Sequence, residues 1–160
     1  MLQSYFESIK YVGHLLPVSF LRIFLGYFYI DLAVKGWKDY LAIGNSVSEL
    51  FIEALNKPMM PGWYRILLSE QLIPHWNVVA FVLIGLHLAV GISYILGYVV
   101  RPISIIAIFL CLNYLTLSSV DKETFFKLMI ACHILLAWVG AGRCLGLDYY
   151  FYKRRRGVWW

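Results

Sequence analysis

The sequence predicts an all-α membrane protein: a four-transmembrane-helix bundle with an amphipathic helical cap between the first and second helices. Three observations predict it. First, hydrophobic residues make up 61% of the 160 residues and charged residues only 14%, whereas soluble domains carry roughly 25% charged residues. Second, four long apolar segments follow one another along the chain. Third, a soluble domain this short could not bury so much apolar surface. We therefore expect a single membrane domain that covers residues 1–160.

The first predicted span covers residues 14–36. It is unusual because Arg22, Asp31 and Lys35 interrupt an otherwise apolar and aromatic segment. Asp31 precedes Lys35 by four residues, which places the two one helical turn apart in the order that favours an ion pair. The second predicted span, residues 77–100, contains no charged residue. It is longer than the ~20 residues that a helix needs to cross the hydrocarbon.

Two shorter spans complete the predicted bundle. Arg101-Pro102 is expected to end the second span, since proline disfavours helix at the residue before it. The third span then covers residues 103–120, up to the charged run Asp121-Lys122-Glu123. The fourth covers residues 125–141, where Lys127 can extend its ammonium group outward to the membrane surface.

The connection between the first two spans, residues 38–75, is predicted to form the cap. From Ser46 to Asn56, apolar side chains share one helical face and Glu49 and Glu53 lie opposite, which is typical of an amphipathic helix. A second short amphipathic piece is expected from Trp63 to Leu72. Tryptophans along this connection favour a position at the membrane interface.

Lysine and arginine predict the orientation. They gather at the helix ends and above all in the C-terminal tail, residues 143–160, which contains Lys153-Arg154-Arg155-Arg156. Because cytoplasmic segments carry an excess of these residues, we expect a multi-pass protein of the inner (plasma) membrane with both termini in the cytoplasm. The same distribution accounts for the net charge of +5, so the bilayer is the expected partner and nucleic acid is not.

Polar residues inside the spans are the candidates for chemistry, because an ionisable group at membrane depth costs several kcal/mol and faces the bundle interior or water. His87, Gly91, Tyr94, Tyr98 and Arg101 form one stripe of the second span at helical spacing. The predicted catalytic residues are His87, His133 and Asp31. The predicted substrate- or quinone-binding residues are Arg22, Lys35, Tyr94, Arg101 and Asn113. Five of these residues are expected to line a polar cavity for a quinone head group or an anion: Arg22, Asp31, Lys35, His87 and His133.

Each of these residues also has a structural interpretation. An intramembrane histidine or asparagine can simply form a hydrogen bond across helices, at roughly 0.6–2 kcal/mol. The three cysteines, Cys111, Cys132 and Cys144, form no Cys-x-x-Cys pair and are expected to be buried, inert thiols. His87 and His133 are a possible axial pair for a haem, but two histidines alone are a weak motif. We expect no metal and no haem.

A series of short motifs resembles the DoxX/DoxD-like membrane proteins, and most of all the DoxD-type subunit of thiosulfate:quinone oxidoreductase. The motifs extend over nearly the whole chain. They are Leu21 to Gly26 with Lys35-Gly36-Trp37, Pro61 to Tyr64 with Ile73-Pro74-His75, Gly91 to Gly97 with Arg101, Leu112-Asn113-Tyr114, and the closing Gly140 to Asp148. One departure is His87, which stands where many relatives carry a glutamate. In the closing motif, Gly140 and Gly142 are expected to end the fourth helix.

The resemblance implies a function. DoxD-type proteins oxidise thiosulfate to tetrathionate and pass electrons to a quinone, usually with a small partner subunit. The first hypothesis is therefore a subunit of a quinone-linked membrane oxidoreductase with a membrane or periplasmic partner, in which Arg22, Lys35, His87 and Arg101 bind the anion or quinone and His133 relays protons. The alternative is a non-catalytic accessory subunit of a larger membrane complex. A second copy of the chain is a further possible partner in either case.

Overall fold

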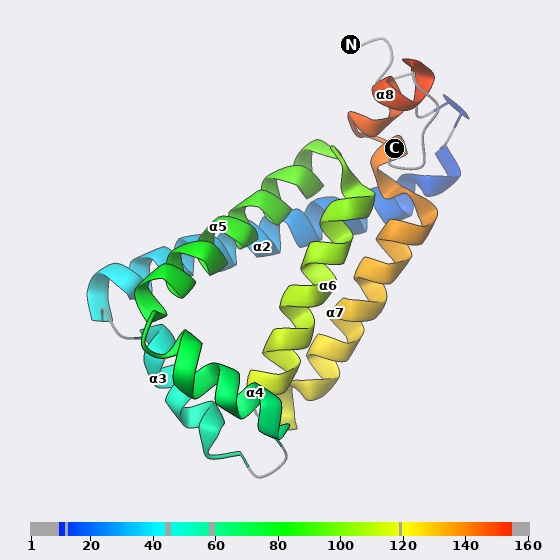
Figure 1. Cartoon of the computed structure of the whole chain (residues 1–160). Helices are drawn as coiled ribbons and strands as arrows, with labels where there is room; N and C mark the ends of the chain where they lie inside the picture. The colour runs from blue at the N-terminus through cyan, green and yellow to red at the C-terminus, as the bar shows by residue number, and fades with distance from the viewer. Residues whose placement is uncertain (1–9, 12, 44–45, 58–59, 119, 155–160) are drawn as a thin grey trace.

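The structure, a computed structural model, describes residues 10–11, 13–43, 46–57, 60–118 and 120–154 (Figure 1). Within these ranges the chain is helical between short turns and contains no strand, which confirms the all-α prediction. The end of the predicted basic tail, residues 155–160, lies outside the described part of the chain.

Four long helices pack as two pairs. They are α2 (Leu16–Ile43), α5 (Trp76–Leu96), α6 (Val100–Leu117) and α7 (Val120–Val139). The most extensive contacts join α2 to α5 and α6 to α7. The two pairs meet at the end that carries α8 (Asp148–Arg154) and diverge toward the other end (Figure 1).

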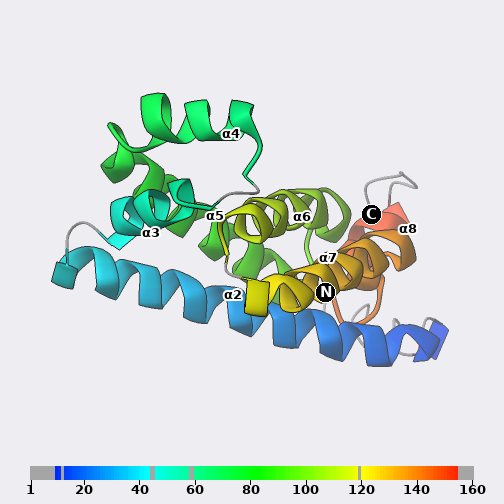
Figure 2. The same ribbon diagram turned by 90° about the horizontal axis from the view of Figure 1, so that it is seen from below.

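The diverging end carries the cap. It contains α3 (Ser46–Leu55), α4 (Gly62–Leu67) and a π-helical turn, η2 (Leu68–Leu72). These match the two amphipathic pieces that the sequence predicts. In Figure 2, α3 and α4 lie on the same side of α2 as α5. Their inward faces, together with Met60 from the loop between α3 and α4, form a small apolar core: Phe51, Ala54, Met60, Tyr64 and Leu68.

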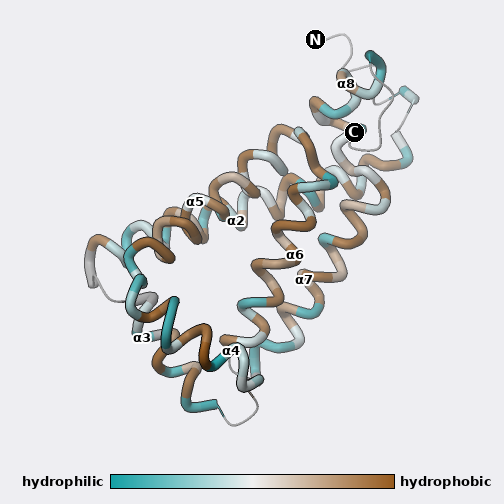
Figure 3. The backbone as a smooth tube through the Cα atoms, in the orientation of Figure 1, coloured by the Kyte–Doolittle hydropathy of each residue, from teal (hydrophilic) through white to brown (hydrophobic). Residues whose placement is uncertain are grey.

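Three helical segments of the described chain are long and apolar enough to cross a membrane: Gly13–Leu41, Trp76–Leu96 and Val100–Leu117. They identify a multi-pass membrane protein. Hydrophobic residues dominate most of the length of α5 (Figure 3). The fourth predicted span corresponds to α7, which is 20 residues long. It is not among the three candidate spans, and its first two turns contain Asp121, Lys122, Glu123 and Lys127.

The first span is longer than predicted. Helix α2 continues to Ile43, so the residues after 37 belong to the long helix and not to the cap. No glycine or proline interrupts this stretch. The rings of Trp37 and Tyr40 lie 5.9 Å and 4.8 Å from the ring of Phe81 on α5. This aromatic packing gives the extra turns a partner, which explains why the helix continues.

The turn between α5 and α6 corrects a second boundary. The break falls at Gly97 and Val99, with φ of 63° and 54°, and not at Arg101-Pro102. Pro102 lies in the first turn of α6, where a backbone N–H would have no carbonyl partner within the helix, so the missing N–H of proline costs no helical hydrogen bond. Likewise α7 begins at Val120 and not near 125, because acidic residues are favourable at a helix N-terminus. Its end before Gly140, with φ of 68°, is as predicted.

Candidate functional site

His133 lies at the centre of the bundle and has no exposed surface. Its Nε2 atom is 2.9 Å from the hydroxyl of Tyr29 on α2, and its Nδ1 atom is 2.8 Å from the hydroxyl of Tyr94 on α5. Both tyrosines are also buried. One imidazole from α7 therefore connects the α6–α7 pair to the α2–α5 pair through both of its nitrogens.

The hydrogen bonds continue beyond both tyrosines. The Tyr94 hydroxyl is 2.9 Å from Oγ of Ser104, which in turn donates to the carbonyl oxygen of Val100 at 2.8 Å. On the other side, the Tyr29 hydroxyl is 3.3 Å from Sγ of Cys111. We call the five residues Cys111, Tyr29, His133, Tyr94 and Ser104 the histidine–tyrosine chain. It draws on all four long helices.

His87, the second predicted histidine, lies beside this chain. The centroids of its ring and that of Tyr29 are 5.8 Å apart. Its Nδ1 is 2.5 Å from the carbonyl oxygen of Leu83. Because a carbonyl can only accept, Nδ1 carries the proton and Nε2 is the acceptor. The hydroxyl of Tyr114 donates to that Nε2 at 3.2 Å.

Four members of this region were not predicted as site residues: Tyr29, Ser104, Cys111 and Tyr114. One signal could have indicated the first, because Tyr29 shares a face of its helix with Arg22 and Gly26 at spacings of three and four. Ser104 and Cys111 are seven residues apart on α6 with Ala107 between them, and all three are buried. A stripe of small residues at helical spacing is the signal for a close helix contact. Cys111 is buried, as expected, and its Sγ contacts the hydroxyl of Tyr29.

Arg22 lies at the α8 end, away from His87. It has no exposed surface. Its two terminal nitrogens donate to the carbonyl oxygens of Ala141 at 3.1 Å and Leu145 at 2.7 Å. These carbonyls belong to residues 140–148, which we call the closing segment. An added Cβ on Gly97 would lie 2.7 Å from Cζ of Arg22, so the glycine makes room for the guanidinium.

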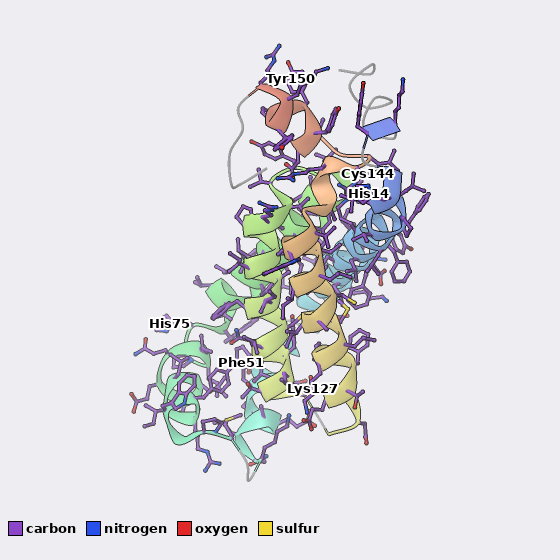
Figure 4. All side chains as sticks on the ribbon, turned by 90° about the vertical axis from the view of Figure 1, so that its right-hand side faces the viewer. His14, Phe51, His75, Lys127, Cys144 and Tyr150 are labelled. Atoms are coloured by element: carbon purple, nitrogen blue, oxygen red, sulfur yellow. The ribbon has the colours of Figure 1, made fainter. Side chains whose placement is uncertain are left out.

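Asp148 ends the closing segment and caps a different helix. Its carboxylate accepts hydrogen bonds from the backbone N–H groups of Val99 at 2.7 Å and Val100 at 3.1 Å, at the start of α6. Burial raises the pKa of this carboxyl, while the two N–H groups act in the opposite direction. Arg101 is at the same end: an added Cβ on Gly140 would lie 3.2 Å from its Nη2 atom. Figure 4 shows Cys144 of the closing segment at one end of the bundle and Phe51 of the cap at the other.

Asp31 and Lys35 form the predicted ion pair, with 2.6 Å between Oδ2 and Nζ. Their side chains are 36% and 66% exposed. The pair therefore lies on the outer face of α2, and the structure places Asp31 outside the histidine–tyrosine chain.

Asn113 connects the bundle to the cap. Its Oδ1 atom accepts from the hydroxyl of Tyr64 on α4 at 3.1 Å. Close by, the ammonium of Lys57 donates to the carbonyl oxygens of Leu117 and Ser118, at the C-terminal end of α6. Burial lowers the pKa of Lys57 and raises the pKa of Tyr64. A cation is favourable at a helix C-terminus, so these two contacts fix the cap to α6.

Replacing Lys57 by methionine is expected to loosen the cap. The carbonyls of Leu117 and Ser118 would lose a charged donor, and a hydrogen bond to a charged group contributes about 1.5–3 kcal/mol when it is well buried. Because Lys57 is only partly buried, we expect the free energy of opening α3 and α4 to fall by about 1 kcal/mol. Amide hydrogen exchange of residues 46–57 and 60–73 measures it. The exposed Lys122→Met variant is the control, and equal exchange in both variants would contradict the role of Lys57.

No group of three or more histidine, cysteine, aspartate or glutamate side chains in the described ranges is arranged to hold a metal ion. No known protein family, curated protein or solved structure gives a match to the chain. The DoxX/DoxD-like assignment therefore stays a prediction, based on the order of the motifs in the sequence.

Proposed function

We propose that the chain is a membrane subunit of a quinone-linked oxidoreductase, and that the histidine–tyrosine chain supplies or accepts the proton that accompanies electron transfer. The observation that carries the proposal is the buried His133 ring with a tyrosine hydroxyl on each nitrogen. A neutral imidazole has one N–H and one lone pair, so it can take up a proton at the nitrogen with the lone pair and release it again. A tyrosine hydroxyl can pass a proton in the same way.

The chemistry of the proposed reaction requires such a group. Two thiosulfate ions give one tetrathionate ion and two electrons, and no proton is released. A quinone that becomes a quinol takes up two electrons and two protons. The protons must therefore reach the quinone by a separate route, which in a bilayer needs hydrogen-bonded side chains. Thiosulfate is proposed as the donor because of the motif resemblance.

His87 and Tyr114 are the residues that best fit a quinone head group. Their hydrogen bond, at 3.2 Å, is longer than the two that His133 makes with its tyrosines, so it costs less than either of those to exchange for a ligand. The Tyr114 hydroxyl donates, as a quinone carbonyl requires. Its ring stacks on Phe126 with 5.6 Å between centroids, which provides a flat apolar surface beside the donor.

The proposal includes four spans. Helix α7 would be the fourth, because large apolar side chains on it face outward: Leu128 at 63%, Ile134 at 52% and Trp138 at 84% exposed. Lys127 pairs with Glu123 one turn away, which lowers the cost of placing both near the membrane surface. Both termini would then be in the cytoplasm of an inner (plasma) membrane protein, with α3 and α4 on the outer side.

The second candidate function is a non-catalytic accessory subunit. One observation favours it: Arg22 and Asp148, both within motifs that suggested the family, bind this chain's own backbone. A partner subunit would then carry the substrate site.

Quinone reduction by the complex tests the proposal. The protein is purified from native membranes with its partners, given thiosulfate and a water-soluble quinone, and the quinone absorbance is followed. We expect thiosulfate-dependent reduction, and a loss of about 10²-fold in rate for His133→Ala, since general acid–base groups contribute roughly 10²–10⁴-fold. His14→Ala is the matched control, because His14 is exposed and lies outside the histidine–tyrosine chain.

The outcomes separate the two functions. A wild-type complex that reduces no quinone would favour the accessory subunit. Reduction that survives His133→Ala at the wild-type rate would exclude the histidine–tyrosine chain from the reaction. If His133→Ala does not fold, His133→Gln retains a hydrogen-bonding side chain that cannot titrate, and it should lose activity to the same extent.

A further inference from the structure

The hydrogen bonds of the histidine–tyrosine chain have a single direction, which follows from counting protons. The Ser104 hydroxyl has one hydrogen. It is directed at the carbonyl oxygen of Val100, 2.8 Å away, and a carbonyl can only accept. The hydrogen in the 2.9 Å contact between Tyr94 and Ser104 must therefore come from Tyr94.

The same count then fixes the tautomer of His133. The hydrogen of Tyr94 is committed to Ser104, so the 2.8 Å contact between Tyr94 and Nδ1 requires Nδ1 to be the donor. A neutral imidazole carries only one N–H. Nε2 is consequently a lone pair that accepts from the Tyr29 hydroxyl at 2.9 Å. The Tyr29 oxygen can in turn accept from the thiol of Cys111 at 3.3 Å.

Resting on the proposed function, we propose that Ser104 is a positioning residue that fixes the Nδ1–H tautomer of His133 and so makes Nε2, on the Tyr29 side, the atom of this site that takes up a proton. The Ser104 end is closed, because the Val100 carbonyl cannot carry a proton onward. A proton therefore enters and leaves from the side where Tyr29 and His87 lie.

Proton uptake has a defined rearrangement. When Nε2 takes a proton it becomes a donor, and the Tyr29 hydroxyl must turn its hydrogen away from the ring. Sγ of Cys111, 3.3 Å from the Tyr29 oxygen, is placed to accept that hydrogen. Nδ1–H keeps its bond to Tyr94 throughout. One proton is added at Nε2, the Tyr29 O–H turns to Sγ, the Cys111 S–H turns away from the Tyr29 oxygen, and the other hydrogen bonds of the histidine–tyrosine chain are unchanged.

The surroundings of His133 allow this proton uptake only when a compensating negative charge is near. Besides His133, the titratable groups in and beside the histidine–tyrosine chain are Tyr29 from α2, Tyr94 and His87 from α5, Cys111 and Tyr114 from α6, and Cys132 from α7 itself. Among the described residues, no carboxylate forms a hydrogen bond or ion pair with a member of the histidine–tyrosine chain. A buried cation without a paired anion is costly. The negative charge that develops on a quinone during reduction would provide the compensation.

The tautomer can be measured directly on resting protein. In protein labelled with ¹⁵N-histidine, the nitrogen shifts and the couplings to the ring protons distinguish Nδ1–H from Nε2–H, and His133→Gln identifies the signal among the four histidines. We expect Nδ1–H in the wild type. In Ser104→Ala, Tyr94 loses its acceptor and turns its hydrogen to Nδ1, so His133 should switch to Nε2–H. Ser104→Thr keeps a hydroxyl that can bond Val100 and should restore Nδ1–H.

Cys111→Ala is the matched control at the other end of the chain. It removes a donor to Tyr29 and leaves the bonds that set the tautomer unchanged, so Nδ1–H should persist. An Nε2–H signal in the wild type, or Nδ1–H retained in Ser104→Ala, would overturn the proposal. These spectra need no quinone activity, so they remain decisive even if the proposed function fails.

A second measurement tests the entry of the proton at Nε2. With that atom occupied in Ser104→Ala, the quinone reduction rate should fall by about tenfold, and Ser104→Thr should retain the wild-type rate. A switched tautomer with an unchanged rate would show that protons do not enter at Nε2.

Discussion

Replacing Arg22 by methionine should lower the free energy of unfolding by about 3–5 kcal/mol, since breaking a buried charged interaction from one side leaves its partners unsatisfied. The guanidinium has no exposed surface and donates to the carbonyl oxygens of Ala141 and Leu145. Methionine has a similar length but offers neither of these donors. The buried carbonyl of Ala141 and the partly buried carbonyl of Leu145 would lose these donors. Both belong to the closing segment, which joins α2 to the turn between α5 and α6.

The geometry of arginine matters as much as its charge. The two terminal nitrogens bind carbonyls four residues apart, and a lysine ammonium, as a single point, cannot reach both in the same way. We expect Arg22→Lys to lower the free energy of unfolding by about half as much as Arg22→Met does. Arg22→Lys would still attract an anion, so a variant that unfolds early but binds substrate normally identifies a structural role.

Unfolding of the purified protein in mixed micelles with increasing dodecyl sulfate, followed by circular dichroism, measures these effects. Arg65→Met is the control, because Arg65 is exposed and its guanidinium donates to the carbonyl oxygen of Lys57 at the surface of the cap. Its cost should stay below about 0.5 kcal/mol, as for most surface substitutions. Equal costs for the Arg22 and Arg65 variants would show that the closing segment does not depend on Arg22.

The helices could be predicted from the sequence more accurately than their ends. Long apolar segments, the amphipathic cap helix and the spacing of Asp31 and Lys35 all depend on local periodicity, and the structure contains each of them. The predicted break at Arg101-Pro102 was wrong, because a proline that disfavours a helix interior is tolerated in the first turn of a helix. The extension of α2 depends on packing against Phe81, which no local pattern reveals.

The candidate site was predicted only in part, for a similar reason. His87, His133 and Tyr94 do come together, as polar residues at membrane depth should. Arg22 and Arg101 were both predicted to bind the anion or quinone, but a buried guanidinium can bind backbone carbonyls as well as a ligand. Which polar residues meet depends on how α2 pairs with α5 and α6 with α7. That pairing brings Tyr29 to His133, and it cannot be deduced from the spacing of residues within one helix.

The pairing of α2 and α5 itself depends on two glycines. An added Cβ on Gly91 would lie 2.6 Å from Cγ1 of Ile30 and 3.0 Å from the carbonyl oxygen of Gly26. An added Cβ on Gly26 would likewise lie 3.0 Å from the carbonyl oxygen of Gly91. The backbones therefore touch at this crossing, as small residues permit in membrane helices.

Gly91→Leu should accordingly be the other severe substitution. Because backbone atoms surround the new side chain, the helices must separate, and overpacking of this kind costs about 3 kcal/mol. Gly85→Leu in the same helix is the matched control: a Cβ there meets nothing within 4 Å, and leucine has the better helix propensity by several tenths of a kcal/mol. Its stability should equal or exceed that of the wild type in the same dodecyl sulfate titration.

The two leucine variants also connect packing to the site. Tyr94 follows Gly91 by three residues and faces His133, so a shift of α5 at the crossing moves its hydroxyl away from Nδ1. In Gly91→Leu the ¹⁵N signal of His133 should therefore lose the single Nδ1–H form even where the protein remains folded, while Gly85→Leu keeps it. Unfolding curves that coincide for both variants would refute the close crossing. If Gly91→Leu is destabilised but its His133 signal is unchanged, the packing at the crossing does not control the geometry of the site. The Tyr94–His133 bond would then tolerate a displaced α5.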